Sequence, residues 1–281
     1  MEIIRTVKHM QQKAVELRKQ SQIIGFVPTM GYLHEGHLSL VTKARERSDV
    51  VVLSIYVNPT QFAPNEDLEK YPRDFERDEK LAKDAGVDIL FYPSNDEMYP
   101  APYLTYVNVD GITQSLCGAS RPDHFRGVTT ICTKLFHAVQ PHIAIFGQKD
   151  AQQAIVIQRM VRDLNFDLEI VVAPIIRESD GLAMSSRNSY LSSEERQDAV
   201  KLYESLRLAQ NMIESGERQS STIKETIRGH ICQSAHARID YIACVDTVTL
   251  QDVETIQGNV LIALAVVMGK TRLIDNLHIN I

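Results

Sequence analysis

The chain has 281 residues, 44% of them hydrophobic and 23% charged, a balance typical of a folded globular protein. Its 36 Asp and Glu residues outnumber 30 Lys and Arg, which gives a formal net charge of −6. A chain of this charge has no overall attraction for nucleic acid, although a local basic pocket could still hold a small phosphorylated ligand.

Targeting, membrane and disulfide signals are weak. Residues 1–20 are charged throughout, which argues against a signal peptide, and the longest apolar run, 260–268, is too short to span a membrane. The four cysteines show no C-x-x-C spacing, so neither a disulfide framework nor a zinc ribbon is indicated. We expect a cytoplasmic protein with reduced thiols and no membrane partner.

Strand-like and helix-like segments alternate over the first two-thirds of the chain. This alternation predicts a mostly parallel sheet covered by helices on both faces. The expected strands are 23–30, 50–58, 87–92, 142–146 and 168–176, and the expected helices are 36–47, 73–85, 125–139 and 151–164.

The pattern changes after residue 187. Ser192 stands three residues before Glu195, a capping box that predicts a long helix to about residue 215. The segments that follow predict a second helix and a small antiparallel sheet, over 221–235, 239–245, 260–268 and 273–279. The chain is therefore expected to form an α/β domain over 1–180 and a smaller α+β domain over 181–281, with 178–188 as a hinge.

Unusual polar segments follow the predicted strands. Ligands of open α/β sheets bind outside the carboxyl ends of the strands, so these segments are expected to share one cleft. They are Thr29-Met30-Gly31 with His34–His37, Asn58-Pro59-Thr60-Gln61, Gly147-Gln148-Lys149-Asp150, and Arg177.

His34-Glu35-Gly36-His37 is the most informative of them. Two imidazoles three residues apart at a helix N-terminus can face one ligand, and unpaired N–H groups there favour phosphate. The short pattern also occurs by chance, and zinc binding is less favoured because no third ligand has an obvious spacing.

Two further segments could bind a nucleotide. Lys149 could reach a phosphate and Asp150 could hold Mg²⁺ through water, although an ordinary helix start is the simpler alternative. Ser185, Ser186 and Arg187 form a compact anion-binding set that could equally be a polar surface loop. Residues 269–271 resemble the end of a P-loop, but Leu264 stands where that motif needs glycine.

Over nearly its whole length the chain resembles the pantothenate synthetase (pantoate–β-alanine ligase) family, in the nucleotidyltransferase superfamily. Four long matches in order carry the resemblance. They are Pro28-Thr29-Met30-Gly31-Tyr32-Leu33-His34-Glu35-Gly36-His37, Tyr56-Val57-Asn58-Pro59-Thr60-Gln61-Phe62, Phe146-Gly147-Gln148-Lys149-Asp150 and Ser179-Asp180-Gly181-Leu182-Ala183-Met184-Ser185-Ser186-Arg187-Asn188.

The resemblance implies ATP-dependent condensation of (R)-pantoate with β-alanine through a pantoyl-adenylate, with release of AMP and pyrophosphate. It also implies a Rossmann-like first domain, a smaller C-terminal domain, Mg²⁺ and a homodimer. One departure is visible in the loop 121–127, where Asp123 stands in place of an expected glycine.

The resemblance also implies roles for particular residues. His37 would be the proton donor, His34 would contact the triphosphate, and these two with Lys149 and Arg187 form the expected catalytic set. Gln61 and Gln153 would hold pantoate, Gln61 would lie near β-alanine, and Asp150 is the expected metal ligand. The expected ATP-binding residues are Met30, Gly31, Tyr32, Leu33, His34, Glu35, Gly36, His37, Gly147, Gln148, Lys149, Asp150, Ile176, Met184, Ser185, Ser186 and Arg187.

Two other functions stay open on these patterns. A cytidylyltransferase could use the same turn on a phosphorylated substrate and would prefer CTP. A regulatory protein could bind ATP without turnover.

Overall fold

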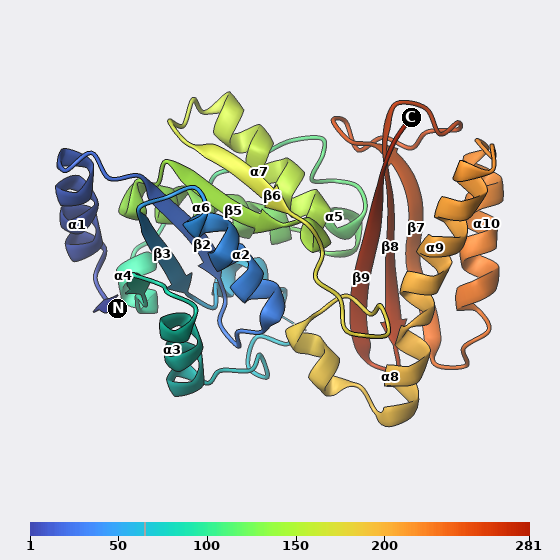
Figure 1. Ribbon diagram of the computed structural model, residues 1–281, viewed down its shortest axis with the longest axis horizontal. Coiled ribbons are helices and arrows are strands. Elements are labelled where there is room, and N and C mark those ends of the chain that lie inside the picture. The colour runs from blue at the N-terminus through green and yellow to red at the C-terminus, as the bar shows by residue number, and fades with distance from the viewer. Residues whose placement is uncertain (65) are drawn as a thin grey trace. The chain divides into compact units, whose positions relative to one another are not determined.

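The computed structural model describes residues 1–64 and 66–281, which pack into two compact units (Figure 1). Unit 1 comprises Met1–Asp110, Arg121–Gly147 and Val156–Pro174. Unit 2 comprises Gly111–Ser120, Gln148–Ile155 and Ile175–Ile281, so it includes two short segments from earlier in the chain. The expected division of the chain at residue 180 stays a prediction.

Unit 1 is built on a six-stranded sheet in the order β1-β4-β3-β2-β5-β6, and every neighbouring pair is parallel. All six residues of β3 are buried, as expected for a strand covered on both faces. The predicted parallel sheet is therefore confirmed. Its strands are β1 (Glu2–Ile4), β2 (Ile24–Thr29), β3 (Val50–Ile55), β4 (Ile89–Phe91), β5 (Ile143–Gly147) and β6 (Glu169–Ala173).

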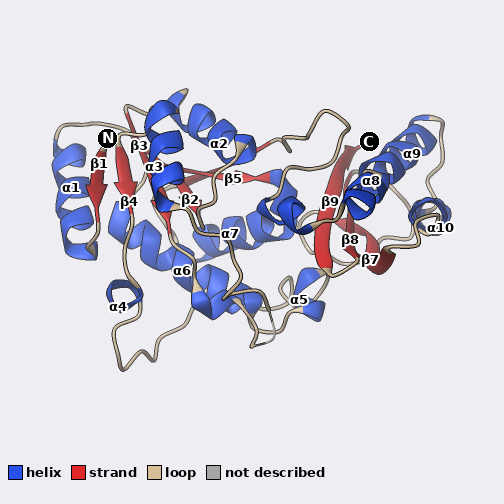
Figure 2. Cartoon of the chain, turned by 90° about the horizontal axis from the view of Figure 1, so that it is seen from below, coloured by secondary structure: helices blue, strands red, loops and turns tan. Residues whose placement is uncertain are grey.

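Helices cover this sheet on both faces, with α2 and α3 on one side and α6 on the other (Figure 2). Apolar side chains from α2, α3 and the strands form one buried cluster that includes Val41, Ala82 and Leu53. The helices of unit 1 are α1 (Val7–Lys19), α2 (Glu35–Arg45), α3 (Phe75–Asp84), α4 (Asn95–Met98), α6 (His124–Val139) and the 3₁₀ turn η1 (Pro59–Gln61). Helix α7 (Ala151–Asp163) begins in unit 2 and ends in unit 1.

Unit 2 contains the expected small antiparallel sheet, in the order β7-β8-β9. Helices α9 and α10 lie along this sheet (Figure 1) and bury their apolar sides in one core with β8. The elements are α5 (Cys117–Ser120), η2 (Gln148–Asp150), η3 (Ser186–Tyr190), α8 (Ser193–Ala199), α9 (Lys201–Glu214), α10 (Ser220–Ile231), β7 (Ala237–Asp246), β8 (Asn259–Met268) and β9 (Thr271–Asn280). The P-loop-like residues Gly269 and Lys270 form the turn between β8 and β9.

Several predicted boundaries were wrong. Strand β3 ends at Ile55 rather than at residue 58, because Pro59 opens η1 and Asn58 turns its side chain into the protein. The capping box of Ser192 is present, but the long helix is two helices that meet at Val200. The first strand and α1 were not predicted.

Within residues 1–64 and 66–281, no helix combines the length and apolarity needed to cross a membrane.

Candidate active site

The strand order of unit 1 reverses between β2 and β5, which are parallel neighbours. From β2 the chain builds outward through β3 and β4, whereas β5 and β6 extend the sheet the other way. Open α/β sheets bind their ligands at such a switch point, outside the carboxyl ends of the strands. The segments that follow β2 and β5 are therefore the first candidates for a site.

The turn after β2 has an unusual backbone. Gly31 and Tyr32 both have positive φ angles, of 83° and 51°. A Cβ atom on Gly31 would lie 2.9 Å from the Asp78 carboxylate, so glycine is required there for space as well as conformation. The N–H groups of Tyr32 and Leu33 donate to the two oxygens of Asp78, at 2.6 and 2.7 Å. These two expected ATP-binding residues thus direct their amides into the protein.

His34 and His37 lie together at the N-terminus of α2, with ring centroids 4.1 Å apart. His34 Nδ1 accepts the Gly36 N–H at 3.1 Å, and His37 Nδ1 accepts the His34 N–H at 3.3 Å. A ring nitrogen that accepts a hydrogen bond carries no proton, so each neutral imidazole carries its proton on Nε2. The capping arrangement therefore makes Nε2 the donor atom of both rings.

Gln61 is held by Asn58, which was not among the predicted site residues. Asn58 is buried, and its Nδ2 donates to Gln61 Oε1 at 3.0 Å and to the Gly127 carbonyl at 3.1 Å. With its oxygen engaged, the Gln61 amide directs Nε2 toward Met30 Sδ, 3.1 Å away. The predicted pantoate residue Gln61 and the predicted ATP residue Met30 are therefore in contact within unit 1.

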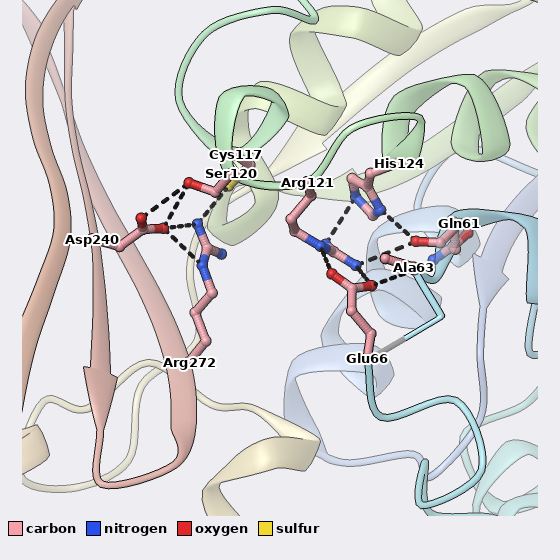
Figure 3. Close-up of polar contacts among 9 residues, drawn as sticks. All are labelled: Gln61, Ala63, Glu66, Cys117, Ser120, Arg121, His124, Asp240 and Arg272. Carbon is pink, nitrogen blue, oxygen red and sulfur yellow. Dashed lines mark hydrogen bonds and ion pairs between the residues drawn. The ribbon is translucent and has the colours of Figure 1, made fainter.

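A charged cluster adjoins the backbone of Gln61 (Figure 3). Arg121 pairs with both oxygens of Glu66, at 2.6 and 2.8 Å, and contacts His124 Nε2 at 3.1 Å. His124 Nδ1 in turn lies 2.9 Å from the Gln61 carbonyl oxygen. Burial raises the pKa of Glu66, but the Arg121 guanidinium outweighs it and leaves that pKa below its ordinary value. Glu66, Arg121 and His124 were not among the predicted site residues.

The same loop contains Asp123, the departure from the expected glycine. Its φ is 65°, in the left-handed region that glycine adopts without strain. Aspartate is among the residues that tolerate this conformation best. The loop thus keeps a backbone suited to glycine, and Asp123 leads directly into α6.

In unit 2, the segment that follows β5 is anchored by Asn276 of β9. Asn276 Nδ2 donates to the carbonyl oxygens of Gln148 and Lys149, at 2.9 and 3.0 Å. The backbone of η2 is thereby fixed, so the position of the Lys149 side chain depends on the sheet of unit 2 as well as on β5.

Burial lowers the pKa of Lys149, and the charge of Arg187 lowers it further, whereas Asp150 and Asp275 oppose the shift. Lys149 and Arg187 are therefore close enough to repel each other. Ser185 caps η3, and its Oγ accepts the Arg187 N–H at 3.3 Å, which orders the start of that turn. Two neighbouring cations on ordered segments form a suitable place for a polyanion such as a triphosphate.

Arg177 also has a carboxylate partner. Its guanidinium pairs with both oxygens of the buried Asp275, at 2.6 and 2.9 Å, and stacks on Tyr203 at 4.3 Å. Burial raises the pKa of Asp275, and Arg177 opposes that shift. Arg177 thus secures the loop of Ile176 and Met184, whose backbones are hydrogen-bonded to each other at 3.0 Å, rather than presenting a cation to a ligand.

Adjacent glutamines at the start of α7 differ in environment. Gln152 is buried and bonds the backbone of Ile112, Ser115 and Cys117 at 2.8 to 2.9 Å. It holds the 111–120 segment within unit 2, together with the contacts of Ser120 and Arg272 with Asp240 shown in Figure 3. Gln153, the expected pantoate residue, is half-buried.

Comparison with known proteins identifies the family. The model of the family "Pantoate-beta-alanine ligase" matches residues 2–278. The pantothenate synthetase of Thermotoga petrophila is 57% identical over 276 residues, which are 98% of this chain and 99% of that protein. The pantothenate synthetase of Moorella thermoacetica is 54% identical over 281 residues, with 100% and 99% coverage.

Solved structures agree with these matches. The pantothenate synthetase of Thermus thermophilus superimposes with a TM-score of 0.93 at 43% identity and covers 99% of both chains. The pantoate–β-alanine ligase of Francisella tularensis, complexed with β-γ ATP and β-alanine, gives a TM-score of 0.80 at 37% identity, with 99% and 97% coverage.

Proposed function

Since the chain belongs to the pantoate–β-alanine ligase family, we propose a residue-level mechanism for the ATP-dependent condensation of (R)-pantoate with β-alanine. The chain is an enzyme that forms pantothenate. In the proposed mechanism it does so through a pantoyl-adenylate and releases AMP and pyrophosphate. ATP as its nucleotide is supported by the Francisella tularensis relative, which is described in complex with a form of ATP.

The turn from Met30 to His37 binds ATP in this proposal. His34 and His37 donate hydrogen bonds from Nε2 to phosphate oxygens, because backbone amides occupy both Nδ1 atoms. The N-terminus of α2 adds a partial positive charge. His37 is also the proposed proton donor. Tyr32 and Leu33 contribute by shaping the turn.

Further ATP-binding residues are proposed in unit 2. Lys149 and Arg187 supply positive charge. Burial, and to a lesser extent the charge of Arg187, lowers the pKa of Lys149, and a polyanion bound beside Lys149 would oppose that shift. Ser185 and Ser186 orient phosphate oxygens. Removing one donor of this kind typically costs on the order of 3 kcal/mol in the transition state. The remaining proposed ATP contacts are Gly31, Glu35, Gly36, Gly147, Gln148 and Ile176, with Met184.

Asp150 is the proposed Mg²⁺ ligand. Its carboxylate is exposed, and no group of three or more His, Cys, Asp or Glu side chains suited to a metal occurs in the part of the chain that the structure describes. Mg²⁺ is commonly held by one or two carboxylates, water and substrate phosphates, so an exposed aspartate can serve as its protein ligand. When bound, Mg²⁺ would neutralise charge on the phosphate oxygens.

Gln61 and Gln153 are proposed to hold pantoate. Gln61 is suited to an anionic substrate because Asn58 occupies its oxygen and leaves Nε2 as the donating side of the amide. Gln61 also lies near β-alanine in this proposal. Fixing pantoate beside ATP makes the attack effectively intramolecular.

The reaction then runs in two steps. A pantoate carboxylate oxygen attacks the α-phosphorus, a new P–O bond forms, and the bond to pyrophosphate breaks. The uncharged amine of β-alanine next attacks the acyl carbon, the C–O bond to AMP breaks, and the amine loses a proton. Exclusion of water during the second step protects the adenylate from hydrolysis.

The observation that carries the mechanism is the paired Nδ1 capping of His34 and His37 at the N-terminus of α2. Pantoate-dependent exchange of labelled pyrophosphate into ATP, without β-alanine, tests it. Exchange that requires CTP would instead support a cytidylyltransferase, and ATP binding without exchange would support a regulatory protein. A homodimer and a cytoplasmic location remain predictions.

A further inference from the structure

Asp78 of α3 is a buried carboxylate with no place in the mechanism above. It is 1% exposed, and its two oxygens accept the N–H groups of Tyr32 and Leu33. A carboxylate at that depth is stabilised only where hydrogen bonds or charges replace water. The two amides supply those bonds, and Arg77 Nη1 lies 3.6 Å from Oδ1.

The Asp78 carboxylate in turn provides the hydrogen-bond acceptors for the N–H groups of Tyr32 and Leu33. The Tyr32 amide follows Gly31 and the Leu33 amide follows Tyr32, both residues with positive φ, and successive amides in such a turn form an anion-binding concavity. In this protein the concavity holds the Asp78 side chain. A further hydrogen bond of the turn, from the Gly31 N–H to Thr29 Oγ1, is longer, at 3.2 Å.

Side chains pack around the turn unevenly, although Gly31 is buried and a Cβ atom there would lie 2.9 Å from Ile55 Cγ2. Leu33 is fully buried in the core cluster of unit 1, and the Arg77 guanidinium stacks 5.0 Å from the Tyr32 ring. Against Met30, Gly31 and Tyr32, however, lies a cavity of about 500 Å³ that Asp78 also lines. On the side of this cavity, the hydrogen bonds to Asp78 therefore add to packing in holding the backbone.

We propose that Asp78 is a positioning residue for adenylation, which sets the Gly31-Tyr32-Leu33 turn so that His34 begins α2 with both imidazoles aimed at ATP. The proposal rests on the function assigned above to His34 and His37. In this proposal Asp78 acts on the reaction through the turn, by way of its bonds to Tyr32 and Leu33. Its loss lets the turn relax toward ordinary negative φ values and shifts the start of α2 relative to Met30.

Two substitutions of Asp78 remove one or both of the hydrogen-bond acceptors for Tyr32 and Leu33. Asp78→Asn keeps the shape and one acceptor oxygen, whereas Asp78→Ala removes both acceptors. A displacement of about 1 Å in a catalytic group typically costs about a hundredfold in rate. We expect Asp78→Ala to lose about that much pantoate-dependent ATP–pyrophosphate exchange, with a raised KM for ATP as well as a lowered kcat, and Asp78→Asn to lose less.

Asp74→Ala is the matched control for a purely structural role. Asp74 Oδ1 caps α3 by accepting the Arg77 N–H at 3.1 Å and makes no bond to the turn. Its loss weakens the same helix and leaves the Tyr32 and Leu33 bonds in place. All rates are compared at a temperature where circular dichroism shows each variant folded.

Hydrogen exchange gives a readout independent of activity. In the wild type, the amides of Tyr32 and Leu33 should exchange slowly, and in Asp78→Asn at least one should exchange faster while the β2 amides stay protected. Faster exchange of that turn together with the graded loss of adenylation supports the proposal. Wild-type adenylation in folded Asp78→Asn and Asp78→Ala, or an equal loss in Asp74→Ala, overturns it.

A failure of the proposed function can be distinguished from a failure of the role proposed for Asp78. If the wild type itself shows no pantoate-dependent exchange, the proposed function is wrong. If ATP–pyrophosphate exchange is normal in the wild type and equally normal in folded Asp78→Asn and Asp78→Ala, only the role of Asp78 is wrong. Should Asp78→Ala fail to fold, Asp78→Asn alone decides, because it preserves volume and one hydrogen bond.

Discussion

Replacing Asn58 by aspartate should reverse the polarity of Gln61 without changing the shape of the site. Asn58 Nδ2 donates to Gln61 Oε1 at 3.0 Å, whereas a carboxylate oxygen there would repel it. The Gln61 amide is then expected to turn over, so that Nε2 donates to the new carboxylate and Oε1 faces Met30 Sδ. Pantoate would meet an acceptor in place of a donor.

The size of the effect follows from the bond that is lost. A hydrogen bond to a charged group contributes about 1.5–3 kcal/mol. Taking about 2 kcal/mol, at 1.4 kcal/mol per factor of ten, Asn58→Asp should raise the KM for pantoate about thirtyfold. The carboxylate also faces the Gly127 carbonyl oxygen, 3.1 Å from Nδ2, so the free energy of unfolding should fall by about 1–3 kcal/mol.

The assay is steady-state pyrophosphate release at saturating ATP and β-alanine, with pantoate varied, at a temperature where the variant is folded. Thr60→Val is the control, because Thr60 Oγ1 donates to Asn58 Oδ1 at 3.0 Å and makes no bond to Gln61. Its KM for pantoate should stay near that of the wild type. A folded Asn58→Asp enzyme with an unchanged KM, or a similar rise in Thr60→Val, would refute the role of Asn58.

Three more predictions concern single residues. Because the pKa of Lys149 is lowered, kcat/KM for ATP should fall as pH rises through a pKa below 10.5. In Lys149→Arg this fall at alkaline pH should move to higher pH, and a fall at the same pH as in the wild type would contradict the prediction. His37→Asn can still accept the His34 N–H but lacks the Nε2 donor, so its adenylation rate should drop about a hundredfold or more in single-turnover assays with the fold intact, and a rate near the wild type's would exclude donation by His37. Because φ at Asp123 is positive, Asp123→Ala should be less stable than Asp123→Gly by about 1 kcal/mol in denaturant titrations, and equal stabilities would show that the turn is not strained.

The sequence predicted the fold well where local patterns decide it. Continuous apolar runs marked the buried strands, and the Ser192 capping box marked the start of α8. The first strand was missed because three residues, Glu2–Ile4, are too few to show a period, and β1 exists through its pairing with β4. Tertiary pairing supplies what so short a segment lacks.

The candidate site could be proposed from sequence motifs, but its hydrogen-bond network could not. Gln61, His34 and Lys149 stand in long recognisable motifs. Asp78 lies 45 residues beyond Leu33 on an ordinary amphipathic helix, where an aspartate usually indicates a solvated face. Arg177 was expected to share the ligand cleft because it follows a strand, yet its partner, Asp275, comes from a strand 98 residues away. Partners so distant in sequence leave no local signal.

Oxygen labelling tests attack on the α-phosphorus most directly. When pantoate labelled with ¹⁸O in its carboxylate is condensed with β-alanine, the attacking oxygen should leave with AMP. We expect one ¹⁸O atom in the phosphate of AMP and none in pyrophosphate, as measured by mass spectrometry or ³¹P NMR. Label in orthophosphate or pyrophosphate, or unlabelled AMP from turned-over substrate, would contradict the adenylate mechanism.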